Sequence, residues 1–191
     1  MFTDFRHVIE RLKKRIDEVG DSVVRDREKI ISWRTCYGDT DNGFDVSFDD
    51  SEWEPLENWN NFDVPSWFRA QVTIPKRFSG MHVSLSLKIG GYLHSLFNAE
   101  GLIYVDGELV QGIDAYHYEL PLTENAEVDR SYLVALFVFW KPDFNKTQWK
   151  PTTRKAHPNI DPLTEIQVID KTTESFYWDV STAFDVAMSL S

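Results

Sequence analysis

The fold is decided by one stretch of sequence, Leu102-Ile103-Tyr104-Val105-Asp106-Gly107-Glu108-Leu109-Val110. Two short apolar runs flank the pair Asp106-Gly107 in the middle of this stretch. The pair suits the positive φ angles of a two-residue turn, so the stretch predicts a tight β-hairpin. We therefore expect antiparallel β-structure around it.

Segments before the hairpin show the alternation of strands that are buried on one face. In residues 67–74, Phe68, Ala70, Val72 and Ile74 alternate with polar residues, and Pro75 then ends the strand because it lacks an N–H. Residues 81–89 alternate in the same way and stop at Gly90-Gly91. Strands with one apolar face predict an antiparallel sandwich.

Three further segments are predicted to be strands. The nearly unbroken apolar run at residues 132–140 indicates a central strand that is covered on both sides. Residues 44–48 alternate and predict a short outer strand, and residues 166–169 predict a last short strand. Residues 141–162 contain four prolines and little periodicity, so we expect an irregular connection there.

Both ends of the chain are predicted to be helical. Apolar residues recur every three or four positions from Phe2 to Val19, and Gly20 is suited to end that helix. A second helix is expected over residues 21–33, capped by Asp21 or Ser22. A last helix is expected after a cap at Thr172 or Thr173. It reaches the end of the sequence without a stop signal, so we expect a chain that is cut before a further domain.

These predictions define the organisation of the chain. The fold class is mostly β: an antiparallel β-sandwich flanked by N-terminal and C-terminal helices. The expected parts are an N-terminal helical segment at residues 1–34, a β-sandwich domain at 35–170 and a C-terminal helix at 171–191 that leads towards a further domain.

Charge and cysteine content narrow the partners and the compartment. The 191 residues carry a net charge of -11, which repels phosphate backbones and anionic lipids, so we expect neither a nucleic-acid nor a membrane partner. Cys36 is the only cysteine, which excludes an intrachain disulfide and suits a reducing compartment. Charged residues interrupt every apolar run near the N-terminus, so no signal peptide is expected and the predicted location is cytoplasmic.

Catalytic and metal-binding motifs are missing from the sequence. The five histidines are dispersed and no Gly-x-Ser-x-Gly occurs, so we expect no metal site and no nucleophilic triad. Polar groups gather instead between residues 98 and 119. The candidates for contacts to a carbohydrate or to another domain are Asn98, Glu100, Tyr104, Asp114, His117 and Glu119.

Three interpretations of these residues remain open. Carboxylates beside hairpin turns commonly hold loops in place, which is the preferred interpretation. The residues could also bind sugar or a partner. In the third interpretation Glu100 acts with Asp114 or Glu119 as the acid and base of a small hydrolase, whose turnover would vanish in Glu100→Gln or Asp114→Asn. Trp53, Trp59, Trp67 and the Trp149 loop are expected to be exposed, for stacking on a saccharide or for burial against another domain.

Several motifs resemble a known family. They are Ser51-Glu52-Trp53, Asn58-Trp59-Asn60, Trp67-Phe68-Arg69, Ile74-Pro75, Gly80, Asn98-Ala99-Glu100-Gly101-Leu102, Tyr104-Val105-Asp106-Gly107, Gln111-Gly112-Ile113-Asp114 and His117. Together they are similar to the N-terminal region of glycoside hydrolase family 38 α-mannosidases of the cytosolic and vacuolar branch, collinear over roughly residues 2–190. The resemblance implies an antiparallel galactose-binding-like jelly-roll β-sandwich packed on a metal-dependent catalytic domain that removes terminal α-linked mannose. It also implies that the C-terminal helix at residues 171–191 leads towards this catalytic domain, which is absent from the chain.

The resemblance carries no catalytic residue into this chain. The family's His-x-Asp pair and the Trp-rich stretch that follows it do not occur here. We therefore expect no cofactor in this chain, and zinc or another divalent metal in the absent catalytic domain. The expected role is a non-catalytic domain that serves packing, assembly or active-site shaping. Its expected partners are the catalytic domain of the same polypeptide and further copies in a homo-oligomer. The alternative is a free-standing carbohydrate-binding module with a mannoside ligand.

Overall fold

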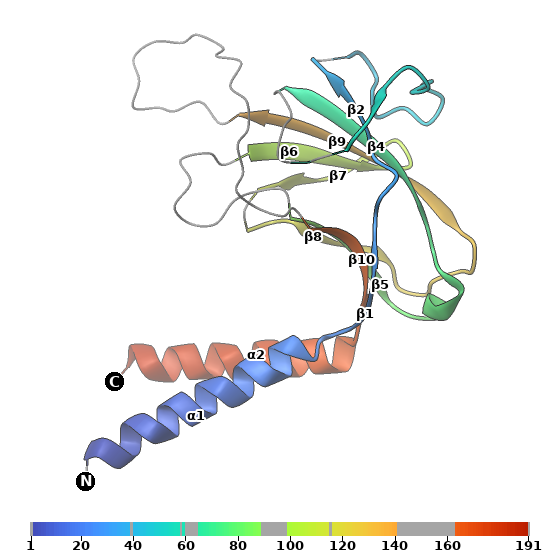
Figure 1. Cartoon of the computed structure of the whole chain (residues 1–191). Helices are drawn as coiled ribbons and strands as arrows, with labels where there is room; N and C mark the ends of the chain where they lie inside the picture. The colour runs from blue at the N-terminus through green and yellow to red at the C-terminus, as the bar shows by residue number, and fades with distance from the viewer. Residues whose placement is uncertain are drawn as a thin grey trace, which may run out of the picture.

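Two antiparallel sheets face each other in the computed structural model, and two helices project from one end of them (Figure 1). The structure describes residues 2–38, 40–57, 59, 65–88, 99–114, 116–140 and 163–190. The mostly β, antiparallel sandwich with flanking helices that the sequence predicts is confirmed. The predicted connection at residues 141–162 lies outside the described residues, as do Asn98 and Trp149.

The smaller sheet has the strand order β1-β10-β5-β8. Its strands are β1 (Val24–Lys29), β10 (Leu163–Ile169), β5 (Val83–Lys88) and β8 (Glu119–Thr123). The larger sheet has the order β3-β2-β4-β9-β6-β7. Its strands are β3 (Glu54–Pro55), β2 (Arg34–Tyr37), β4 (Ser66–Thr73), β9 (Ser131–Trp140), β6 (Ala99–Val105) and β7 (Glu108–Ile113). Sequence neighbours such as β4 and β5 lie in different sheets, so the chain crosses repeatedly between the layers.

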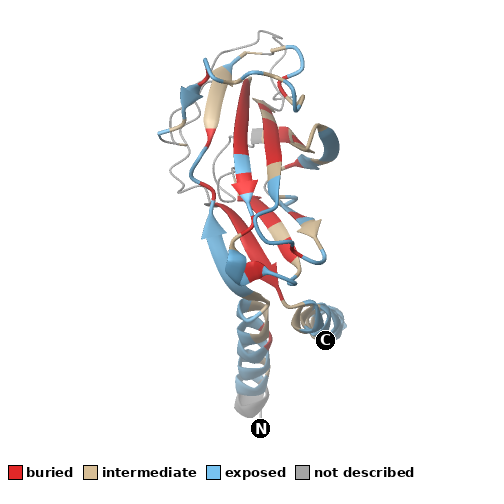
Figure 2. Ribbon diagram, turned by 90° about the vertical axis from the view of Figure 1, so that its right-hand side faces the viewer, coloured by how far each residue is buried: buried red, intermediate tan, exposed pale blue. Residues whose placement is uncertain are grey.

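The main core fills the space between the sheets, where the buried segments of the strands face one another (Figure 2). The predicted alternation holds, because the apolar residues of β4 and β5 point inward while the intervening residues point outward. The largest fully buried side chains are Phe68, Phe78, Ile74, Leu85, Leu87, Ile103, Leu120, Leu136, Ile166, Val83, Val134 and Val138. Burial of this apolar surface stabilises the sandwich.

The predicted hairpin is confirmed. β6 and β7 are joined by a two-residue turn in which Asp106 has φ 50° and Gly107 has φ 87°. Asp106 also ties this turn to the neighbouring strand, because its carboxylate accepts a hydrogen bond from the N–H of Leu133 at 2.8 Å. The predicted central strand is β9, which pairs with β4 on one side and with β6 on the other.

The second predicted N-terminal helix is wrong. The chain leaves α1 (Phe2–Asp21) and enters β1, which pairs with β10, with Arg27 opposite Gln167. The predicted helix rests on the apolar pairs Val23-Val24 and Ile30-Ile31, and five charged residues in succession, 25–29, separate them. Such a charged segment suits an edge strand, where it hinders pairing with other chains.

The predicted outer strand at residues 44–48 is also wrong, because this segment forms turns. Asp45 accepts hydrogen bonds from the N–H and the hydroxyl of Ser47 at 2.7 and 2.8 Å, and Asp49 accepts one from the N–H of Ser51 at 3.0 Å. These local bonds satisfy backbone donors that a strand would use in a ladder. They also lower the pKa of both carboxyl groups, chiefly through the backbone N–H donors.

The last helix, α2 (Lys171–Ser189), forms as predicted but has a different cap. Asp170 caps it and accepts a hydrogen bond from the N–H of Thr173 at 3.0 Å. Arg25 of β1 binds the same carboxylate at 2.5 Å, which fixes the start of α2 to the edge of the smaller sheet. No helix among the described residues is long and apolar enough to cross a membrane.

Candidate functional site

A second cluster of aromatic residues lies on the outer face of the larger sheet, away from the main core. Its members are Trp53, Trp67 and Ala135, which are buried, and Cys36, Phe44, Phe48, Tyr104 and Phe137, which are partly buried. Strand periodicity places Cys36, Trp67, Tyr104, Ala135 and Phe137 on the outer face, because each alternates with residues that point into the core. In register across the sheet, Cys36 lies beside Trp67 and Trp67 beside Phe137.

The loop between β2 and β3 covers this face. Phe44 of the loop stacks on Tyr104 with ring centroids 4.9 Å apart and 15° between the planes. Phe48 packs against Trp53 at 5.4 Å. Gly43 lies so close to the ring of Trp67 that a Cβ at this position would be 2.7 Å from the ring. The chain therefore closes its own aromatic face.

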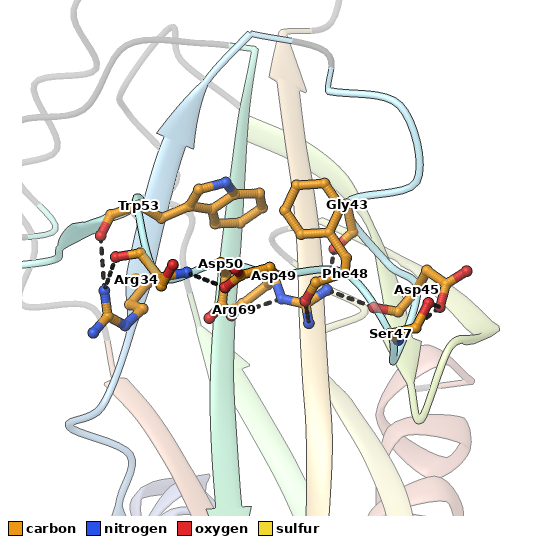
Figure 3. Close-up of polar contacts among 10 residues, drawn as sticks. Arg34, Gly43, Asp45, Ser47, Phe48, Asp49, Asp50, Trp53 and Arg69 are labelled. Atoms are coloured by element: carbon orange, nitrogen blue, oxygen red, sulfur yellow. Dashed lines mark hydrogen bonds and ion pairs between the residues drawn. The ribbon is translucent and has the colours of Figure 1, made fainter.

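Arg69 of β4 holds the loop in place (Figure 3). Its side chain is only 3% exposed, and its Nε donates to the carboxylate of Asp50 at 2.8 Å. One terminal nitrogen donates to the carbonyl oxygens of Gly43 and Asp45 at 2.7 and 2.9 Å, and the other donates to that of Phe48 at 3.3 Å. The guanidinium thus has the paired, multiply bonded environment that a buried charge requires.

Two other interactions complete the arrangement. Arg34 of β2 donates to the carbonyl oxygens of Ser51 and Trp53 at 3.2 and 2.9 Å, which fixes the end of the loop (Figure 3). The guanidinium of Arg69 also lies 5.5 Å from the ring centroid of Phe48 and 5.9 Å from that of Trp53. Cation–π attraction of this kind adds to the hydrogen bonds. The indole N–H of Trp67 is buried and has no hydrogen-bond partner.

Sequence reasoning missed this arrangement. It placed Arg69 on the polar face of its strand and expected Trp53, Trp59 and Trp67 to be exposed. That expectation is wrong, because Trp53 and Trp67 are 7% and 4% exposed, and Trp59 packs on Trp33 and Phe68 of the main core. The available signal was the acidic, aromatic segment at residues 44–53 together with one arginine on a strand between large apolar residues.

The predicted polar constellation is divided between the two sheets. Glu100 and Tyr104 share the outer face of β6, and Tyr104 belongs to the aromatic cluster. Glu119 begins β8 in the smaller sheet. Burial raises the pKa of Glu119, and the neighbouring carboxylate of Glu174 raises it further.

Asp114 and His117 meet in the loop between β7 and β8. One carboxylate oxygen of Asp114 accepts from the N–H groups of Tyr116 and His117 at 2.7 and 2.8 Å, and a ring nitrogen of His117 lies 3.0 Å away. The hydrogen bond from Tyr116, followed by that from the His117 side chain, lowers the pKa of Asp114. Both residues thus have partners that shape their own loop.

A metal centre is not visible in the part of the chain that the structure describes. No three side chains of His, Cys, Asp or Glu in these residues come together in a way that could hold a metal ion. The described carboxylates at Glu100 and Glu119 lie on different sheets, and Asp114 is engaged by its own loop. The site residues named from the sequence therefore remain predictions.

Solved structures with a similar fold are glycosidases. They include a β-glucuronidase of Bacteroides uniformis (TM-score 0.51, 17% identity, covering 75% of this chain and 18% of that chain). A family 2 glycosyl hydrolase from Bacteroides cellulosilyticus has a TM-score of 0.51 and 21% identity, covering 75% of this chain and 21% of that chain. A β-glycosidase from Bacteroides vulgatus has a TM-score of 0.51 and 14% identity, covering 74% and 20%. The chain thus spans about a fifth of the length of these enzymes, and the similarity shows the fold alone.

The sequence itself matches a family model. No curated protein matches the chain. The model for the α-mannosidase jelly-roll domain of the Ams1-like type matches residues 32–139, which run from the start of β2 through the covering loop, Arg69 and the hairpin to β9. The predicted jelly roll and the predicted relationship to α-mannosidases are both confirmed by this match. The chain belongs to the family of α-mannosidase jelly-roll domains.

Proposed function

We propose that this chain is the non-catalytic N-terminal domain of a family 38 α-mannosidase and that it serves packing, assembly or active-site shaping there. The family match supports an ancillary domain of a glycoside hydrolase. The parent enzyme would hydrolyse terminal α-mannosides with zinc or another divalent metal bound in its catalytic domain. We expect this domain to pack against that catalytic domain in the cytoplasm.

The observation that carries the proposal is the closed aromatic face. A saccharide-binding surface presents rings that a sugar can reach and stack on. Here the rings of Trp53 and Trp67 are nearly inaccessible. Gly43 and Phe44 pack against Trp67, Phe48 packs against Trp53, and Arg69 fixes this loop. An aromatic cluster that is filled by its own chain supports a structural role.

The arrangement of the carboxylates also favours a non-catalytic domain. Glycoside hydrolysis needs an acid and a base on opposite sides of one bond. Glu100 and Glu119 belong to different sheets, and the carboxylate of Asp114 is used by N–H groups of its own loop. Glu119 has the raised pKa of a general acid, but burial and a neighbouring acid explain that shift.

The rival function is a carbohydrate-binding module that acts alone. The feature that favours it is the shared outer face of Glu100 and Tyr104 on β6, where a carboxylate and a ring could contact one sugar. Calorimetric titration with mannose and an α-linked mannobiose separates the two functions, with Glu100→Ala as the matched control.

We expect no saturable heat at about millimolar ligand and no hydrolysis of an aryl α-mannoside. Saturable binding that the folded Glu100→Ala variant loses would overturn the structural role in favour of the binding module. Turnover that Glu100→Gln or Asp114→Asn abolishes would instead establish a hydrolase.

A further inference from the structure

The two helices form an antiparallel pair that projects from one end of the sandwich, with both chain termini at the far end (Figure 1). They approach most closely near the sandwich, where a Cβ on Gly20 of α1 would lie 2.8 Å from the ring of Tyr177 of α2. Ile16 is buried, with only 8% of its surface exposed. The pair is thus held together at its base and along one side.

An apolar groove of about 430 Å³ runs between the helices. Leu12 and Val19 line it from α1, and Phe176, Val180 and Ala187 line it from α2. Leu12 is 50% exposed and Phe176 is 55% exposed. Large apolar side chains that gather in an exposed groove mark an interaction surface.

The two edges of the groove carry opposite charges. Successive residues of an α-helix are about 100° apart around its axis. Arg15 therefore lies about 60° around the axis of α1 from Leu12. Asp179 lies about 60° around the axis of α2 from Phe176, in the same direction of rotation. Arg15 itself lines the groove. After Lys171, α2 contains no basic residue. The groove therefore has a basic edge on α1 and an acidic edge on α2.

We propose that a second copy of this chain covers the groove, so that each α1 lies along the α2 of the partner in a four-helix bundle. A twofold axis parallel to the helices produces this arrangement and brings the basic edge of each copy to the acidic edge of the other. In that arrangement Arg15 faces the partner's Asp179 at two symmetric positions. The apolar stripes then meet in the centre, as in other four-helix bundles.

Self-complementarity is the reason for choosing a second copy. A partner helix with one sign of charge would match one edge of the groove and be repelled by the other. A copy that is turned by the twofold axis matches both edges. Within the single chain Arg15 pairs with Glu18 at 2.7 Å, but both side chains are exposed, so this pairing is weak and can be exchanged.

The inference specifies the assembly role in the proposed function, and it is tested on the full 191-residue chain by sedimentation equilibrium up to about 100 µM. We expect a dimer in reversible equilibrium with the monomer. Arg15→Asp and Asp179→Arg should each weaken dimerisation at least about tenfold, because each change creates two like-charge contacts. The double variant should restore it.

Matched controls place the same charge changes on the opposite faces of the helices. Lys14→Asp lies about 200° around α1 from Leu12, and Asp185→Arg lies about 180° around α2 from Phe176, so neither should affect dimerisation. Circular dichroism confirms that each variant is folded.

A chain that stays monomeric at all concentrations would overturn the proposal, and so would a dimer that the groove variants leave unchanged. If the double variant with Arg15→Asp and Asp179→Arg does not dimerise as the native chain does, the twofold pairing is excluded. These results leave the proposal of a non-catalytic α-mannosidase domain unchanged, because that proposal rests on the sandwich and not on the helices. They decide only whether the domain assembles through its helices.

Discussion

Replacing Arg69 by methionine is the sharpest test of how this domain holds its aromatic face. Methionine keeps much of the length and the apolar stem of arginine but removes the guanidinium. Four hydrogen bonds are lost, one to the carboxylate of Asp50 and three to backbone carbonyl oxygens. The ring contacts to Phe48 and Trp53 lose their cationic partner as well.

The expected loss of stability follows from these contacts. A carbonyl group that is left without a donor costs about 1 kcal/mol, and breaking a buried ion pair costs about 3–5 kcal/mol when the remaining charge stays buried. Asp50 is 30% exposed, so water can solvate its carboxylate and reduce that cost. We therefore expect Arg69→Met to lower the free energy of unfolding by about 3 kcal/mol, or Tm by roughly 6–12 °C.

Urea denaturation followed by tryptophan fluorescence measures this loss, because Trp53 belongs to the loop and Trp67 lies beneath it. The control is Arg130→Met, which removes a half-exposed arginine paired with Asp106 and should cost about 0.5 kcal/mol. Arg69→Lys keeps the charge but cannot reproduce the several N–H donors of the guanidinium, so we expect an intermediate loss of unfolding free energy. A loss below about 1 kcal/mol for Arg69→Met would refute the conclusion that this arginine fixes the loop.

Three further predictions concern the sheets and the start of α2. Gly101→Ala should cost about 3 kcal/mol or more in urea denaturation, because its Cβ would lie 2.5 Å from the carbonyl oxygen of Phe137, whereas Gly112→Ala has 3.7 Å of clearance and should be nearly neutral. The hydrogen bonds to Asp170 lower its pKa to about 2. Its stabilising effect should therefore be complete above pH 4 and be lost as the pH falls through 2, so Asp170→Ala should lower Tm at pH 7 and have little effect near pH 2. The raised pKa of Glu119 has the opposite sign, because the ionised form is the unfavourable one. Glu119→Gln should raise Tm slightly at pH 7, and this gain should be lost as the pH falls below about 4, where the carboxyl group becomes protonated in both states.

The β-sandwich could be predicted from the sequence because its strands obey local rules. Alternation in β4 and β5, the Asp106-Gly107 turn and the apolar run of β9 each specify one conformation from neighbouring residues alone. β1 could not be recognised in this way. Its charged residues have no strand pattern of their own, and its conformation is fixed by pairing with β10, more than a hundred residues away in the sequence.

The closed aromatic face could not be predicted for a similar reason. The sequence shows that Trp53 and Trp67 are large and apolar, but not which segment covers them. The covering loop is irregular and is held by hydrogen bonds from Arg69 to its backbone carbonyls, which no side-chain pattern encodes. Because those carbonyls belong to the loop, the arginine determines the position of the loop rather than that of any one ring. If the loop is the element that separates a structural domain from a sugar-binding one, Arg69→Met should not only destabilise the protein. In the fraction that remains folded it should expose Trp67, and we expect the variant to bind a mannoside more tightly than the native chain does, because a sugar could then stack on this ring.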